Sequence, residues 1–252
     1  MTVYREVVKL LPGARYVYCA DDVCFPYSDL GETPLTARVL AVAQSIMEQY
    51  EPDLFIVACN TVSTVALAAL RERFEVPIVG TVPAVKPAAA ASKSKLISVL
   101  GTEATVRQEY TLTLIEDFAA DCEVTLVGSR RLASIAEADM RGEPVDDDEI
   151  GREIAPCFVE KDGKRTDVIV LGCTHYALLL ERLQRLAPWP VQWLDPAPAI
   201  AKRVADLLAG AGDLKEGAPA SAVFTSGNPP LSVLEHLGFA LDPRPLTVET
   251  GE

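Results

Sequence analysis

The sequence is poor in several features that mark particular classes of protein. It carries 23 Lys and Arg residues against 36 Asp and Glu residues, which gives a net charge of −13, and the basic residues are scattered. This balance argues against a nucleic-acid-binding surface. No window reaches the ~20 apolar residues of a membrane-spanning helix, and the first residues lack the apolar core of a signal peptide. We therefore expect a cytoplasmic protein with no nucleic-acid or membrane partner.

Cysteine and histidine are also scarce. The chain has six cysteines and two histidines in 252 residues, and no Cys-x-x-Cys pair occurs. Six cysteines are too few for a disulfide scaffold and fit a reducing compartment. His175 lies two residues from Cys173, but no further Cys/His cluster completes a tetrahedral ligand set. We therefore expect neither a metal site nor a redox pair of cysteines.

What the sequence does contain is a regular alternation of strand and helix patterns. Short apolar runs alternate with segments whose apolar residues recur at helical spacing, which predicts an α/β protein with two doubly wound, parallel-sheet domains. The stretch 92–95, Ser-Lys-Ser-Lys, resembles a hinge. We expect a first domain of residues 1–92 and 195–252, to which the tail returns with a strand at 222–225. Residues 93–194 then form the second, similar domain.

One pattern occurs twice in the chain. Residues 53–61 read Asp-Leu-Phe-Ile-Val-Ala-Cys-Asn-Thr, and residues 167–175 read Asp-Val-Ile-Val-Leu-Gly-Cys-Thr-His. Each copy predicts a buried parallel strand with its cysteine, Cys59 or Cys173, at the carboxyl end, where the chain enters a helix. Open α/β sheets keep their chemistry at these ends. We therefore expect the two thiols to face one pocket from opposite sides.

Two thiols in such positions could work as a pair. The free N–H groups and the dipole of a helix start stabilise a thiolate, so we expect the pKa of Cys59 and Cys173 to fall below the usual ~8.5. One thiolate could then remove a proton from a substrate while the other thiol returns one to the opposite face, which inverts a stereocentre. Four neighbouring polar residues could bind a substrate carboxylate together with the backbone: Asn60, Thr61, Thr174 and His175.

A simpler interpretation makes each cysteine a small core residue, because cysteine is among the most buried residue types. The polar pair beside each of the two repeated cysteines favours the catalytic interpretation, since a structural cysteine needs neither Asn-Thr nor Thr-His beside it. The remaining cysteines lack this context, and we expect them to be structural: Cys19, Cys24, Cys122 and Cys157.

The two cysteine motifs resemble those of a known enzyme family. Residues 58–61, Ala-Cys-Asn-Thr, and 171–176, Leu-Gly-Cys-Thr-His-Tyr, are similar to the motifs of the cofactor-independent aspartate/glutamate racemases. The second motif resembles that of the glutamate racemases in particular. Residues 18–28 and the Gly-Thr-Glu-Ala-Thr stretch at 101–105 resemble two further family segments. The resemblance spans nearly the whole chain.

This resemblance implies two α/β domains with the active site between them, interconversion of L- and D-glutamate without a cofactor, and a role in peptidoglycan precursor supply. It implies that Cys59 and Cys173 are the acid/base pair and that His175 assists Cys173. The substrate contacts that it implies are Tyr27, Ser28, Asn60, Thr61, Thr174 and His175. Two alternatives stay open: a related racemase or isomerase that acts on aspartate or another α-substituted acid, and a catalytically silent binding protein. The oligomeric state is also open, a homodimer included.

The sequence departs from the family pattern in two places. Family members begin with a strand and an Asp-Ser-Gly-x-Gly-Gly loop before the helix that here starts at Met1, and this chain lacks both. In the family, that loop supplies an aspartate that assists the first cysteine and a serine that contacts substrate. We therefore expect an amino-terminal truncation or a start codon assigned too far downstream, with an open sheet edge, an unfilled pocket wall, and lower stability and activity. Ser28 stands where the family has glycine, which affects substrate fit.

Overall fold

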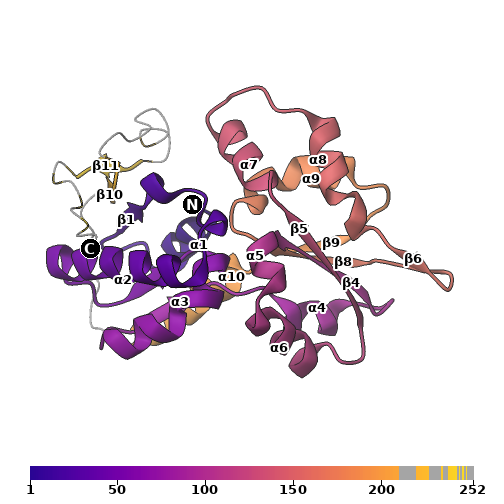
Figure 1. The fold of residues 1–252 in the computed structure, drawn as a ribbon, viewed down its shortest axis with the longest axis horizontal. Coiled ribbons are helices and arrows are strands. Elements are labelled where there is room, and N and C mark those ends of the chain that lie inside the picture. Colours follow the sequence, from indigo (N-terminus) through magenta and orange to yellow (C-terminus); the bar gives the residue numbers. More distant parts are fainter. Residues whose placement is uncertain are drawn as a thin grey trace.

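The computed structural model describes residues 1–209, 220–226, 234, 238–242, 244, 246 and 248. Helices alternate with strands along the chain, and the elements form two lobes that lie side by side (Figure 1). Among the described residues, the strand pairs are parallel except for one short hairpin of β6 (Glu160–Lys161) and β7 (Lys164–Arg165). The predicted α/β class with parallel sheets is therefore confirmed.

The first lobe contains two short sheets, with strand orders β1-β10-β11 and β2-β3. Its strands are β1 (Val17–Ala20), β2 (Phe55–Val57), β3 (Ile78–Gly80), β10 (Ser221–Phe224) and β11 (Ala240–Leu241). Its helices are α1 (Thr2–Leu10), α2 (Glu32–Tyr50), α3 (Asn60–Arg73) and α10 (Ala197–Leu208). Two 3₁₀ turns, η1 (Asp22–Cys24) and η2 (Tyr27–Asp29), connect β1 to α2.

The second lobe is built on one four-stranded sheet with the order β5-β4-β8-β9. Its strands are β4 (Leu96–Thr102), β5 (Glu123–Ser129), β8 (Val168–Gly172) and β9 (Gln192–Leu194). Its helices are α4 (Val85–Ala91), α5 (Glu103–Arg107), α6 (Glu109–Phe118), α7 (Leu132–Met140), α8 (Asp147–Ile154) and α9 (Leu180–Leu186). Two 3₁₀ turns, η3 (Ala155–Cys157) and η4 (Tyr176–Leu179), complete it.

Helices cover both faces of the second sheet because its central strands, β4 and β8, are mostly apolar and are buried at every position. All residues of β4 and β8 are buried, and successive side chains of a strand point to opposite faces. One face packs against α7, α8 and α9 through Leu100, Ile169 and Leu171. The other face packs against α4 and α6 through Val99, Val168 and Val170. The sheet is therefore doubly wound, and Cys173 follows directly after the buried strand β8.

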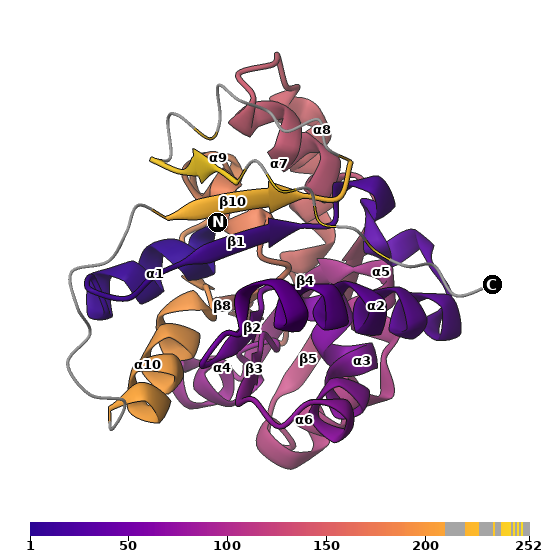
Figure 2. The same ribbon diagram turned by 90° about the vertical axis from the view of Figure 1, so that its left-hand side faces the viewer.

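The tail returns to the first lobe, where β10 pairs with β1 in the register Val17↔Ser221 to Ala20↔Phe224. This strand is the one predicted at 222–225. Figure 2 shows β1 and β10 as one pair of strands and β2 and β3 as another. Helices α1 and α10 pack on each other through an apolar cluster that includes Val3, Val7 and Ala201.

A cavity of about 680 Å³ separates β1 from β2. Residues 17–19 of β1 and all three residues of β2 line it, together with Val39 and Val42 of α2 and Val204 of α10. The two strands end separate sheets, so the edges that face the cavity carry no neighbouring strand among the described residues.

Candidate active site

Cys59 lies at the turn from β2 into α3, as the repeat predicted. It occupies the position before the first helical residue, and its carbonyl accepts the Ser63 N–H at 3.0 Å. The backbone N–H groups of Thr61 and Val62 and the Thr61 hydroxyl are near enough to the Cys59 sulfur to lower the pKa of its thiol. The side chain lines the cavity. The start of α3 therefore lies on one side of Cys59, and the cavity lies on the other.

Cys173 follows β8 directly, but the chain does not enter an α-helix there. The Tyr176 N–H bonds to the Cys173 carbonyl at 3.1 Å and the Leu178 N–H to the His175 carbonyl at 3.0 Å, which are the contacts of the 3₁₀ turn η4. Helix α9 begins only at Leu180. The buried Tyr176 side chain accounts for this tight turn, because its hydroxyl is anchored to the Gly101 carbonyl at 3.1 Å. The prediction of a helix start at Cys173 was therefore wrong in the type of helix.

A hydrogen-bonded chain of three residues leads to the second thiol. The Cys173 Sγ lies 3.9 Å from His175 Nδ1, and His175 Nε2 lies 2.8 Å from Glu137 Oε1. Because a carboxylate can only accept, Nε2 carries a proton and the neutral imidazole leaves Nδ1 as the acceptor toward the thiol. His175 can therefore take and return the proton of Cys173.

Burial determines the acidity of both thiols. It raises the pKa of the Cys173 thiol to about 12, and the hydrogen bonds from the His175 and Tyr176 N–H groups only partly oppose this effect. Burial likewise raises the pKa of Cys59, against the hydrogen bonds from Val62 and Thr61. The prediction of lowered thiol pKa values was therefore wrong: in this structure the cost of burying a charge exceeds the stabilisation from the helix starts.

The two cysteine turns meet although they come from different lobes. A negative charge on Cys59 contributes to the raised pKa of Cys173, so the two sulfurs are within electrostatic reach. The Thr174 hydroxyl donates to the Ala58 carbonyl at 3.1 Å and joins one turn to the other. Cys59, Thr174 and His175 line the cavity, whereas Cys173 is only 8% exposed and is not among the lining residues, so of the two thiols only that of Cys59 faces the cavity as expected.

Asn60 and Thr61 are buried beside Cys59 but differ in their partners. Asn60 is 2% exposed, and neither atom of its side-chain amide has a hydrogen-bond partner. Buried polar atoms are nearly always paired, so an orphaned amide indicates a missing ligand. The Thr61 hydroxyl lies 3.2 Å from the Thr102 hydroxyl and 3.3 Å from the Thr105 hydroxyl, and thus connects the two lobes.

The two remaining predicted contacts lie in η2. Tyr27 lines the cavity, and its hydroxyl donates to Asp21 at 2.6 Å. The Ser28 hydroxyl lies 3.4 Å from Asp29 Oδ1, and Ser28 is not among the residues that line the cavity. The structure therefore brings Tyr27 to the site but turns the Ser28 side chain elsewhere.

Sequence reasoning missed Glu137, which lines the cavity from α7. Burial raises the pKa of Glu137, but the hydrogen bond from His175 and the nearby basic side chains outweigh this effect and hold the pKa below its usual value, so its carboxylate stays ionised. Nothing in the amphipathic pattern around residue 137 distinguishes this glutamate from a solvated one. Only the fold brings it to His175.

Two other features are absent from the parts of the chain that the structure describes. No cluster of three or more His, Cys, Asp or Glu side chains is placed to hold a metal ion among those residues. No helix in that part of the chain is long and apolar enough to cross a membrane.

Comparison with known proteins identifies the family. The family model for Asp/Glu/hydantoin racemases matches residues 1–204. A glutamate racemase of Mesorhizobium japonicum is 48% identical over 247 residues, which are 97% of this chain and 94% of the relative. A glutamate racemase of Brucella canis is 48% identical over 96% of this chain and 88% of the relative.

Solved structures agree with the sequence relatives. The Escherichia coli glutamate racemase in complex with L-glutamate and the activator UDP-MurNAc-Ala is 39% identical, with a TM-score of 0.88 over 95% of this chain and 91% of that one. The Thermus thermophilus glutamate racemase in complex with β-chloro-D-alanine is 27% identical, with a TM-score of 0.75 over 97% of this chain and 92% of that one. With two cysteine turns that meet at one cavity and relatives that match over almost its whole length, the chain belongs to the Asp/Glu/hydantoin racemase family.

Proposed function

We propose that the protein is a cofactor-independent racemase that interconverts L- and D-glutamate, with Cys59 and Cys173 as the acid/base pair. The observation that supports this most directly is the meeting of two cysteine turns from different lobes, joined by the Thr174 to Ala58 hydrogen bond. Two relatives that are 48% identical carry the name glutamate racemase, and the structure of the E. coli relative is a complex with L-glutamate. The D-glutamate formed would supply peptidoglycan synthesis.

The proposed reaction exchanges one proton on each side of the α-carbon. The thiolate of one cysteine removes the α-proton of glutamate, and the electron pair of the broken C–H bond passes into the carboxylate. The thiol of the other cysteine then gives its proton to the opposite face of the planar carbanion. One thiolate and one thiol remain at the end, with their positions exchanged, and the reverse reaction uses them in the opposite order.

His175 and Glu137 give the Cys173 side a route for its proton. His175 Nδ1 can accept the S–H proton, and the ionised Glu137 at 2.8 Å from Nε2 stabilises the imidazolium that results. This matters because burial alone holds Cys173 in its thiol form. On the Cys59 side, the N–H groups of Thr61 and Val62 supply the stabilisation instead.

The substrate contacts proposed from the family pattern are Tyr27, Ser28, Asn60, Thr61, Thr174 and His175. Asn60 has the strongest support, because its unpaired amide offers two donors and an acceptor beside Cys59. The backbone N–H groups at the start of α3 could share a substrate carboxylate with it.

We also propose that residues 1–92 and 195–252 form one domain and that residues 93–194 form the other. The pairing of β10 with β1 and the membership of β9 in the second sheet support this division. Helix α4 (Val85–Ala91) departs from it, because its buried residues pack on the second sheet, which puts the first boundary before Val85 rather than after residue 92. A homodimer is a further proposal, which sedimentation velocity tests.

Cysteine variants test the proposed function against its rivals. Cys59→Ser and Cys173→Ser should each abolish racemisation, which is measured by the circular dichroism of glutamate. Both variants should still bind glutamate in calorimetry. Cys122→Ser is the matched control, because Cys122 is a free thiol remote from the cavity lining. A substrate panel with aspartate and other α-substituted acids distinguishes a related racemase. Binding of glutamate by the unmodified protein without any turnover would indicate a silent binding protein.

A further inference from the structure

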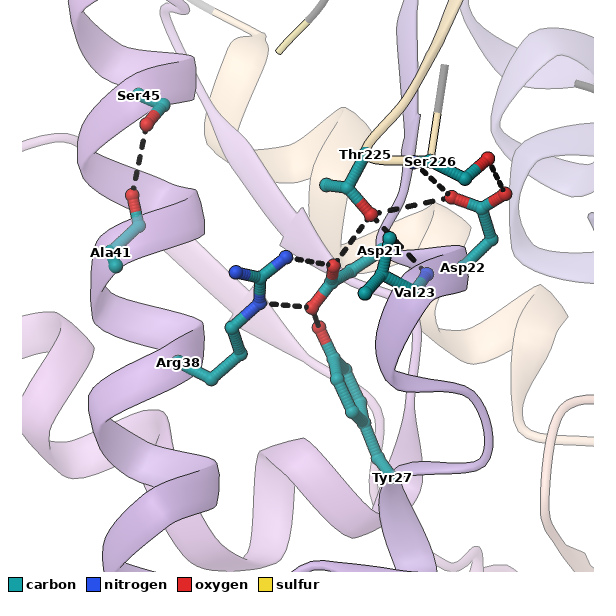
Figure 3. A network of polar contacts seen from close by, with 9 residues as sticks. All are labelled: Asp21, Asp22, Val23, Tyr27, Arg38, Ala41, Ser45, Thr225 and Ser226. Atoms are coloured by element: carbon teal, nitrogen blue, oxygen red, sulfur yellow. Dashed lines mark hydrogen bonds and ion pairs between the residues drawn. The ribbon is translucent and has the colours of Figure 1, made fainter. Parts of the chain in front are cut away.

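A single carboxylate holds together the segment between β1 and α2. The Asp21 side chain is only 4% exposed and accepts four hydrogen bonds. Two come from the Arg38 guanidinium, at 2.8 Å from Nε and 2.5 Å from Nη2. The others come from the Tyr27 hydroxyl at 2.6 Å and the Thr225 hydroxyl at 2.7 Å (Figure 3).

This arrangement joins three parts of the chain that are distant in sequence. Arg38 belongs to α2, Tyr27 to η2, and Thr225 follows β10. The adjacent Asp22 strengthens the link to the tail, because it accepts hydrogen bonds from the N–H and the hydroxyl of Ser226 (Figure 3). The position of residues 21–28, the 21–28 loop, therefore depends on α2 and on the segment after β10.

The network also keeps Asp21 ionised. Burial alone raises the pKa of Asp21, but the hydrogen bonds from Arg38, Tyr27 and Thr225 lower it below its usual value. A buried charge is tolerated only where partners surround it, and loss of one partner leaves the others unsatisfied. The loop thus has one well-defined position rather than several of similar energy.

The loop that Asp21 holds touches both halves of the site. Tyr27 lines the cavity together with Cys59, close enough for a charge on Cys59 to raise the pKa of Tyr27. Phe25, three residues after η1 begins, lies against the His175 ring with a centroid distance of 5.4 Å. A displaced loop would therefore disturb the surroundings of Cys59 and of the Cys173 partner together.

We propose that Asp21 is a positioning residue of the active site: through Arg38, Tyr27 and Thr225 it fixes the 21–28 loop so that Tyr27 borders Cys59 and Phe25 covers His175. This inference rests on the proposed racemase function. It assigns to the segment after β10 a role in substrate binding, although that segment contributes no side chain to the cavity lining among the residues that the structure describes.

Variants of the partners test it, with Arg185→Met as the matched control. Arg185 also pairs with an aspartate, at 2.6 Å from Asp147, but on the exposed surface of α9. We expect Arg38→Met to raise the KM of both glutamate enantiomers about tenfold, the loss that corresponds to a hydrogen bond with a charged group. Arg38→Lys should restore much of the affinity, and kcat should change less than KM. Hydrogen exchange of residues 21–28 should become faster in Arg38→Met and stay unchanged in Arg185→Met.

Thr225→Val keeps the test decisive if Arg38→Met does not fold, because it removes one hydroxyl without changing the size of the side chain. It should also raise KM and speed hydrogen exchange in the loop. If folded variants melt at lower temperature but keep kcat and KM within about twofold of the unmodified protein, Asp21 only stabilises the lobe and the inference fails. If the unmodified protein does not racemise glutamate, the proposed function fails. In that case, hydrogen exchange of residues 21–28 and the calorimetric affinity for glutamate test the inference. An unchanged affinity in the variants would overturn it.

Discussion

His175 turns one ring nitrogen to each of two partners: Nε2 lies 2.8 Å from Glu137 Oε1, and Nδ1 lies 3.9 Å from the Cys173 sulfur. The carboxylate fixes which nitrogen carries the proton, and so determines that the other nitrogen faces the thiol. Cys59 has no such chain among the described residues and relies on backbone N–H groups and the Thr61 hydroxyl. The two half-sites are therefore alike in position but different in how they stabilise a thiolate.

Glu137→Gln should lower kcat/KM about tenfold or more, the usual effect of removing a carboxylate that orients a functional histidine. Glutamine keeps the size of the side chain but can present its amide N–H to His175, which disturbs the ring orientation. Steady-state racemisation measures the effect. Glu143→Gln is the control, because Glu143 is exposed and pairs with Arg141. Equal activities of the two variants would contradict a role for Glu137.

The pH dependence of kcat/KM should have its rising limb on the alkaline side of neutrality. One cysteine must be a thiolate in the free enzyme, and burial raises the pKa of both thiols, so the reactive form increases as the pH rises. Loss of the proton from the second thiol should then produce a falling limb at still higher pH. A profile that is already flat at pH 6 would show that the thiols are acidic in the resting protein.

Asn60→Leu should separate binding from stability. Leucine is similar in size to asparagine and removes an amide that has no partner in the structure, so the free energy of unfolding should be unchanged or increased. The KM for glutamate should rise about tenfold or more, as for the loss of a buried hydrogen bond to a charged ligand. Urea unfolding and racemisation kinetics give the two quantities.

Thr61→Val provides the contrast to Asn60→Leu. It breaks the buried hydroxyl cluster with Thr102 and Thr105, so it should lower the free energy of unfolding by about 1–2 kcal/mol. If Asn60→Leu lowered the free energy of unfolding as much as Thr61→Val or more, the asparagine amide would have a structural role instead.

Tyr176→Phe should destabilise the protein by about 1 kcal/mol, because it removes the hydroxyl that bonds to Gly101 inside the core. The same change should lower racemase activity, since the η4 turn sets the positions of Cys173 and His175. Thermal unfolding and kinetics measure both effects. Tyr110→Phe on the exposed side of α6 is the control and should change neither.

The sequence predicted the parts of the site that depend on local pattern. The apolar runs ending in Cys59 and Cys173 are β2 and β8, because an uninterrupted apolar run suits a strand covered on both faces. The tail strand was predictable for the same reason. Glu137 was not, because its role comes from contact with a residue 38 positions away.

The thiol pKa values show the other limit of sequence reasoning. A helix start next to cysteine suggested acidic thiols, but the extent of burial, which decides the sign of the shift, arises from packing between the lobes. The Asp21 network is similar. The Asp21 partners Arg38 and Thr225 are distant in sequence and meet it only when α2 and β10 are in place.

The most direct test of the two-cysteine claim is racemisation of each glutamate enantiomer in heavy water, stopped at low conversion. If one thiolate removes the α-proton and a separate thiol delivers its own, the product enantiomer should carry deuterium at the α-carbon while the recovered substrate carries almost none. The result should be the same in both directions. Product that keeps the original proton, or deuterium that appears equally in both enantiomers from the start, would indicate a single acid/base group and contradict the assignment of Cys59 and Cys173 to opposite faces.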